Sequence, residues 1–155
     1  ENQLPLLGLV MSSASDEPVV QAAIDTLDQL KVDYEVRVMS AYRNPERVRE
    51  YALSARERGI EVFISAAGGS AALGGVLAAW STIPVIGIPL ASSDLNGIDA
   101  LMATAQMPPG VPVACMAVGS WGARNAALFA AQVLGIKHDD IRESFENYRK
   151  ELQAS

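Results

Sequence analysis

The chain has 155 residues, of which 50% are hydrophobic and 19% are charged, and its formal net charge is -6. Chains of this length and hydrophobic content usually fold as one domain, so we expect residues 1–155 to form a single domain and not a disordered chain. The 18 acidic residues outnumber the 12 Lys and Arg, which argues against nucleic-acid binding because that requires a basic face. An anionic ligand would therefore need local cations.

The N-terminal segment Glu1–Pro5 lacks the basic and apolar regions of a signal peptide, and no uninterrupted apolar run is long enough to span a bilayer. We therefore expect a cytoplasmic protein that does not contact membranes. The single histidine, His138, lies in a polar segment, where we expect it at the surface. One histidine is too few for a multi-histidine metal site and is badly placed for a Ser-His-Asp triad, so no metal is expected.

Short apolar runs alternate along the chain with longer amphipathic or Ala-rich segments, a pattern typical of strand–helix units that build a parallel sheet. The predicted strands are Leu6–Met11, Tyr34–Met39, Val62–Ala66, Val85–Ile88 and Val113–Val118. The predicted helices are Glu17–Leu30, Pro45–Arg58, Ser70–Trp80, a segment within Asn96–Ala105, and Ala123–Leu134. The sequence thus predicts an α/β protein of the flavodoxin-like type.

A last helix is predicted over Asp139–Leu152, because apolar residues recur there at helical spacing. They are Ile141, Phe145, Tyr148 and Leu152. This apolar stripe must be covered, either by the chain's own domain or by a neighbouring subunit.

Three loops follow predicted strands at their carboxyl ends, where ligands bind in open α/β sheets. The loop Met11–Asp16 is rich in hydroxyls, which either cap the next helix or bind phosphate or ribose together with free amides. The loop Ser40–Pro45 carries Arg43, either a solvated charge or a bidentate phosphate ligand. The Gly-rich loop Ser65–Gly75 offers bare amides to a ligand or simply allows tight turns and packing.

Ordered motifs in these loops and beyond resemble those of the class I 5-(carboxyamino)imidazole ribonucleotide mutases of purine biosynthesis, from about Leu6 to Ile136. The family's Met-Gly-Ser-x-Ser-Asp, Ser-Ala-His-Arg-x-Pro and Gly-rich motifs correspond to Met11–Asp16, Ser40–Pro45 and Ser65–Gly75. Further motifs are found at Leu95–Asp99, Gln106–Val113 and Asn125–Leu128.

The resemblance implies a flavodoxin-like three-layer α/β/α sandwich with a five-stranded parallel sheet, assembled as a homo-octamer with active sites at subunit junctions. It then favours a subunit interface for the C-terminal helix, residues 139–153. It implies a mutase that moves CO2 from the exocyclic nitrogen to the ring carbon of a phosphoribosyl-aminoimidazole compound, without a cofactor. The substrate-binding residues that it implies are Ser13, Asp16, Ser40, Arg43, Gly68, Gly69 and Ala72.

The chain departs from the family pattern at positions that matter for proton transfer. The family's two active-site histidines are replaced by Tyr42 and Ala72, its proline by Gly74, and a loop glycine by Ser12, which narrows the phosphate loop. Histidine titrates near neutrality, whereas a phenol with an unperturbed pKa of about 10 is a poor proton shuttle at pH 7. Tyr42 is the candidate catalytic residue in the histidine position. The alternatives are a diverged paralogue that carboxylates or decarboxylates a related heterocycle, and a non-catalytic nucleotide-binding protein.

Overall fold

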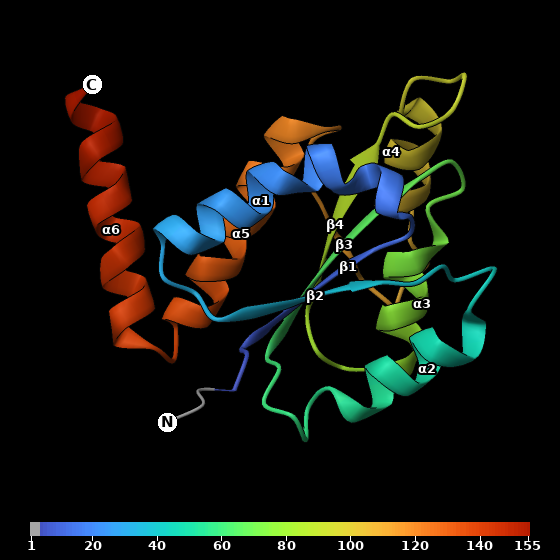
Figure 1. Cartoon of the computed structure of the whole chain (residues 1–155), viewed down its shortest axis with the longest axis horizontal. Coiled ribbons are helices and arrows are strands. Elements are labelled where there is room, and N and C mark those ends of the chain that lie inside the picture. The colour runs from blue at the N-terminus through green and yellow to red at the C-terminus, as the bar shows by residue number, and fades with distance from the viewer. Residues whose placement is uncertain (1–3) are drawn as a thin grey trace.

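The apolar runs of the sequence pair as parallel strands of one sheet, in the order β2-β1-β3-β4-β5 (Figure 1). The structure is a computed structural model that describes residues 4–155. Residues 1–3 lie outside the described residues. They belong to the predicted domain 1–155 and to the N-terminal segment Glu1–Pro5. The strands are β1 (Leu7–Met11), β2 (Tyr34–Val38), β3 (Val62–Gly68), β4 (Val85–Leu90) and β5 (Ala114–Cys115).

Helices cover both faces of the sheet, so the predicted flavodoxin-like sandwich is confirmed. One face packs against α1 (Glu17–Gln29) and α5 (Ser120–Gly135). The other face packs against α2 (Pro45–Ser54), α3 (Ala72–Trp80) and α4 (Ile98–Ala105). Because β1, β3 and β4 are covered on both sides, they consist almost entirely of buried small or apolar residues, as expected for parallel strands.

The fifth strand is much shorter than the predicted Val113–Val118, since only Ala114 and Cys115 pair with β4. Pro89 of β4 explains the difference. Its carbonyl accepts a hydrogen bond from the backbone N–H of Gly119, so this residue faces β5, but proline has no N–H to donate in return. The pairing therefore ends early, although the apolar run continues.

Most helix boundaries lie close to the predicted ones, with three informative shifts. α3 begins at Ala72 and not at Ser70, because Ala71 has a left-handed backbone with φ of 46°. α2 ends at Ser54 and not at Arg58, and α5 begins at Ser120, before the predicted Ala123. A short 3-10 helix, η1 (Ala14–Asp16), was not predicted. No helix among the described residues is long and apolar enough to cross a membrane.

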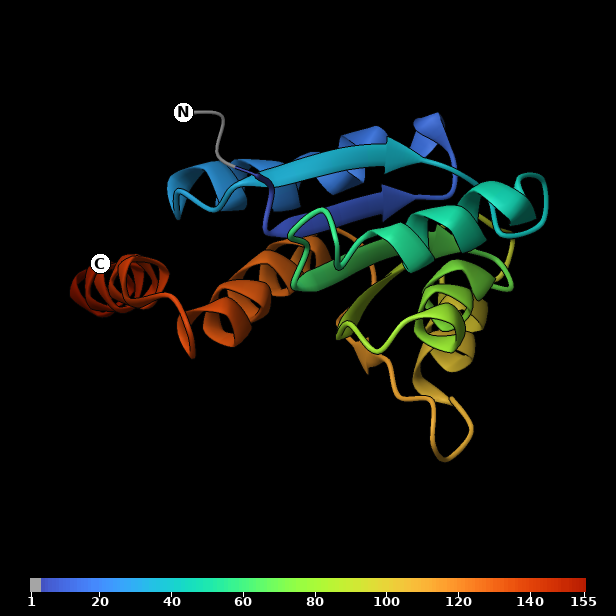
Figure 2. The same ribbon diagram turned by 90° about the horizontal axis from the view of Figure 1, so that it is seen from below.

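The C-terminal helix α6 (Asp139–Ala154) projects past the sheet as a rod beside α5 (Figures 1 and 2). Its first turn is anchored by Ile141, which is buried. His138, expected at the surface, keeps 24% of its side chain exposed, and its Nε2 lies 2.7 Å from Oε2 of Glu61. Burial raises the pKa of Glu61, but hydrogen bonds from Lys137 and His138 outweigh it and hold this pKa below its ordinary value.

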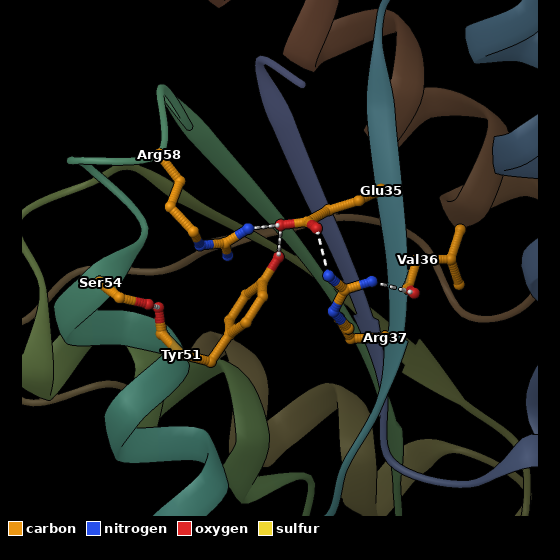
Figure 3. A network of polar contacts seen from close by, with 6 residues as sticks. All are labelled: Glu35, Val36, Arg37, Tyr51, Ser54 and Arg58. Carbon is orange, nitrogen blue, oxygen red and sulfur yellow. Dashed lines mark hydrogen bonds and ion pairs between the residues drawn. The ribbon is translucent and has the colours of Figure 1, made fainter. Parts of the chain in front are cut away.

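A polar network ties the edge strand β2 to the segment that follows α2 (Figure 3). One carboxylate oxygen of Glu35 accepts hydrogen bonds from the hydroxyl of Tyr51 at 3.1 Å and from Arg58 at 2.7 Å. The other oxygen pairs with Arg37 at 2.7 Å. Because Tyr51 is buried and donates to a carboxylate, its pKa is raised. The network therefore fixes the hydroxyl of Tyr51 at one place above β1.

We predict that Gly8→Ala destabilises the protein by about 1–3 kcal/mol, the usual cost of overpacking a core, because a Cβ at residue 8 would overlap the Tyr51 hydroxyl. Tyr51→Phe alone loses the hydrogen bond to Glu35. In the double variant the phenyl ring lacks the overlapping oxygen, so most of the Gly8→Ala cost should disappear. Urea unfolding of the four proteins measures this coupling, and strictly additive costs would contradict it.

Candidate functional site

A hollow of about 390 Å³ lies at the carboxyl ends of the strands. The chain reverses its direction of travel across the sheet between β1 and β3, and loops leaving the sheet at such a point diverge and open a crevice. The hollow is lined by the loops after β1, β2, β3 and β4. Its lining residues are Ser12, Ser13, Ser15, Asp16, Ser40, Ala41, Tyr42, Arg43, Ala67, Gly68, Gly69, Ser70, Ala71, Ala72, Leu73 and Ser92.

All of the site residues predicted from the sequence line this one hollow. They are Ser13, Asp16, Ser40, Tyr42, Arg43, Gly68, Gly69 and Ala72. Their common location is what the position of the three loops led us to expect. Their individual roles in binding and catalysis stay predictions.

The first loop presents hydroxyls and one buried carboxylate. Ser13 caps the short helix η1 by accepting a hydrogen bond from the backbone N–H of Ser15 at 3.3 Å, and its Oγ lies 2.8 Å from that of Ser15. The hydroxyl of Ser12 donates to Oδ2 of Asp16 at 3.2 Å. Burial raises the pKa of Asp16, although the hydrogen bonds from Ser12 and from the backbone of Ser13 oppose this. A carboxylate held in this way can still accept hydrogen bonds from a ligand's hydroxyl or amino groups.

The second loop is held open by its own polar contacts. The hydroxyl oxygen of Ser40 accepts hydrogen bonds from the backbone N–H groups of Tyr42 and Arg43, both at 3.2 Å. The side chain of Asn44 in turn accepts one from the backbone N–H of Ser40 at 3.1 Å. Ser40 therefore stabilises the conformation of the loop, in addition to any contact that it makes with a ligand.

Arg43 is the only cationic side chain among the residues that line the hollow. It is exposed, and no carboxylate of the described residues pairs with it. Its guanidinium is thus available to an anion such as a phosphate, which it can bind through two parallel hydrogen bonds.

The third loop brings backbone close to the hollow. Gly69 and Ala71 both have left-handed backbones, with φ of 61° and 46°. A Cβ at Gly68 would overlap the side chain of Ser92, so only glycine fits beside the loop that follows β4. The packing of Ser92 against Gly68 therefore connects the loop after β4 with the loop after β3.

Sequence reasoning assigned no individual role to Ser70 or Ser92, which also line the hollow. The Ser70 hydroxyl donates a hydrogen bond to the Tyr42 hydroxyl at 2.9 Å, which links the second and third loops. The Tyr42 ring is 68% exposed, so it stands over the hollow and is not part of the core. Ser70 lies in the Gly-rich loop Ser65–Gly75 and also begins the predicted helix Ser70–Trp80, whereas Ser92 lies outside the three loops that the sequence singled out. Nothing in the sequence pointed to these contacts.

The titratable side chains of the lining are Asp16, Tyr42 and Arg43. His138 does not line this hollow, because it pairs with Glu61, which lies just before β3 at the opposite, amino-terminal ends of the strands. Among the described residues, no group of three or more His, Cys, Asp or Glu side chains could hold a metal ion.

Comparisons with known proteins agree with this geometry. The family described as AIR carboxylase matches residues 6–155. The N5-carboxyaminoimidazole ribonucleotide mutase of Pyrococcus abyssi is 52% identical over 150 residues, which cover 97% of this chain and 85% of that protein. The mutase of the same name from Bacillus subtilis is 49% identical over 151 residues, covering 97% and 93%. A crystal structure of Treponema denticola PurE superposes with a TM-score of 0.84 at 25% identity, covering 97% of this chain and 92% of that one.

Proposed function

The chain belongs to the AIR carboxylase family, and we propose on that basis that it is an isomerase, a 5-(carboxyamino)imidazole ribonucleotide mutase of de novo purine biosynthesis. It moves CO2 from the exocyclic nitrogen to the ring carbon and gives 4-carboxy-5-aminoimidazole ribonucleotide. The observation that carries the proposal is the hollow that Arg43 and the hydroxyls of the first loop line together. Since the reaction rearranges one molecule, it requires no cofactor.

We assign the phosphate of the ribonucleotide to Arg43 and Ser13. A phosphate needs positive charge and hydrogen-bond donors, and these two side chains, which line the same hollow, supply both. Asp16 lies deeper and offers acceptors for the ribose hydroxyls or the ring amino group. Gly68, Gly69 and Ala72 lack bulky side chains and leave room for the ring.

The reaction also requires that a proton be removed from the ring carbon and another be supplied to the nitrogen. We assign to Tyr42 the role of the proton donor to the nitrogen. Because Ser70 donates to the Tyr42 oxygen, the hydroxyl hydrogen of Tyr42 is left to donate elsewhere. A hydroxyl group that keeps its hydrogen suits a donor better than a base.

We predict that Arg43→Ala weakens binding of the aminoimidazole ribonucleotide by about 1.5–3 kcal/mol, the usual contribution of a hydrogen bond to a charged group. Isothermal titration calorimetry measures the change. Arg47→Ala is the matched control, because Arg47 is an exposed arginine near the start of α2 that does not line the hollow. Equal affinities of Arg43→Ala and the unchanged protein would refute the phosphate assignment.

We predict that Tyr42→His raises mutase turnover, because imidazole titrates near neutrality and can both give and take the proton. Tyr42→Phe should lower turnover, since it keeps the ring and removes the hydroxyl. Both are followed by ultraviolet absorbance with the carboxyaminoimidazole ribonucleotide as substrate. Ribonucleotide binding without turnover in any of the three proteins would instead favour the diverged or non-catalytic alternatives.

We also propose that the protein is a homo-octamer in the cytoplasm; cell fractionation tests the location. An apolar groove of about 370 Å³ between α5 and α6 supports assembly. It contains Phe145 and Leu152 of the predicted stripe, and Leu152 is 57% exposed in the single chain. A second copy would remove this surface from water.

In solution the particle should have about eight times the chain mass of 16.4 kDa, as measured by sedimentation equilibrium. Leu152→Glu should shift the population toward smaller species, because it places a charge in the covered groove. An exposed residue of α6 outside the groove provides the control, Glu146→Gln. A monomer with an unchanged fold would refute the octamer.

A further inference from the structure

Asp16 occupies a position in the chain that normally serves a helix. It is the N-cap residue of α1, where an aspartate usually accepts a hydrogen bond from a free backbone N–H of the first turn. Within the described part of the chain, its carboxylate makes no such bond. Its backbone is right-handed, with φ of -81° and ψ of -12°, because η1 runs directly into α1, whereas a capping residue is normally extended. The carboxylate of Asp16 is therefore not used to cap the helix.

The carboxylate of Asp16 is held instead by the two residues that follow β1. The Ser12 hydroxyl donates to Oδ2 of Asp16 at 3.2 Å, and the backbone of Ser13 provides a second hydrogen bond. A carboxylate has about four accepting positions, so these two donors leave about half of them for a ligand. Asp16 is only 8% exposed, yet it lines the hollow of the candidate site. A ligand in the hollow is therefore what can reach the free positions.

Ser12 is itself fixed by the sheet. It is the first residue after β1, and its backbone N–H donates to the carbonyl of Ala66 in β3 at 3.0 Å. Ala66 lies in the core and is fully buried. A serine side chain has a single rotatable bond that moves its oxygen, so a fixed backbone leaves the hydroxyl few places to go. Ser12 therefore transmits the geometry of the sheet to Asp16, as a supporting residue of a binding site must.

The hydroxyl of Ser12 is not needed to close the turn of its loop. That turn is closed by Ser13, whose side chain accepts a hydrogen bond from the backbone N–H of Ser15 and whose carbonyl accepts one from that of Asp16 at 3.1 Å. Among the described residues, the Ser12 hydroxyl makes only the bond to Asp16. The family's motif Met-Gly-Ser-x-Ser-Asp predicts glycine at this position, and glycine could not make that bond. The contact is thus directed at the carboxylate and not at the fold.

We propose that Ser12 is a positioning residue of the candidate site, whose hydroxyl holds the Asp16 carboxylate with its free acceptor positions toward a hydroxyl or amino group of the ribonucleotide. The inference rests on the proposed function for the identity of that ligand. The bond of 3.2 Å is longer than the usual O–H···O distance of about 2.8 Å, so it gains strength when a ligand displaces water from the hollow. Without the hydroxyl, binding must also order the carboxylate.

The coupling between the two side chains is tested first without a ligand. A hydroxyl donor favours the ionised carboxylate, so Ser12 lowers the pKa of Asp16 against the larger effect of burial. In Ser12→Ala this pKa should rise, as measured by NMR of ¹³C-labelled aspartate carboxyls, with Asp16→Ala to identify the signal. The charged or titratable groups nearby, Tyr42 and Arg43 of the hollow and the adjacent Glu17, are the same in both proteins. An equal Asp16 pKa in both proteins overturns the proposal.

Calorimetry with the aminoimidazole ribonucleotide then tests the effect on binding. Ser12→Ala should weaken binding several-fold, whereas Ser12→Thr, which keeps the hydroxyl, should retain most of the affinity. Thr26→Val is the matched control. The hydroxyl of Thr26 donates to the carbonyl of Ala22 within α1 at 2.7 Å, and Thr26 does not line the hollow. This variant also removes a hydroxyl from a buried residue, and its affinity should equal that of the unchanged protein.

A double variant shows whether Ser12 acts through Asp16. Ser12→Ala combined with Asp16→Ala should bind as weakly as Asp16→Ala alone, because the hydroxyl then has no carboxylate to hold. Circular dichroism confirms that each variant is folded. Losses that add in the double variant, or an equal loss in Thr26→Val, overturn the proposal. A raised Asp16 pKa in Ser12→Ala, in a protein that does not bind the ribonucleotide, would keep the coupling of the two side chains and refute the proposed function instead.

Discussion

The pairing of β1 with a parallel strand on each side is the constraint on which the candidate site depends. Met11 at the end of β1 is in register with Val38 of β2 and with Ala66 of β3. The pairing continues past the strand ends, since the backbone N–H of Met39 donates to Met11 and that of Ser12 donates to Ala66, both at 3.0 Å. The loops therefore leave the sheet at one level. Their side chains can change chemistry without moving the hollow.

Much of this arrangement could be predicted, because buried parallel strands are continuous apolar runs and the residues after them fall at one edge of the sheet. The fifth strand was overestimated for a reason outside its own sequence. Its run stays apolar to Val118, but the donor that it needs is missing at Pro89 of the neighbouring strand. The start of α3 was misplaced because an alanine at positive φ, Ala71, gives no sign in the sequence.

The same limit applies to the site. Position at the strand ends predicted the loops that carry Ser13, Asp16 and Arg43, and the resemblance to the family then singled out these residues. Ser70 gains its role only from Tyr42, which lies 28 residues earlier, and Ser92 only from its packing against Gly68. Contacts between loops depend on the conformation of each loop above the strand ends. Neither the hydrophobic periodicity of the sequence nor the spacing of its motifs predicts that conformation. Polar residues that act through a partner are the ones that sequence reasoning missed.

The sequence predicts four departures from the family's motifs, and at three of these positions the residue present fits a neighbour. Ser12, in place of glycine, donates to Asp16. Tyr42, at the position predicted for a family histidine, accepts a hydrogen bond from Ser70. Gly74, in place of proline, leaves room for Ser65. A site that had only decayed would hold overlapping or orphaned groups at such positions, because random replacements rarely satisfy a buried polar neighbour. The matched pairs at Ser12, Tyr42 and Gly74 argue instead for a site whose neighbouring residues are fitted to one another.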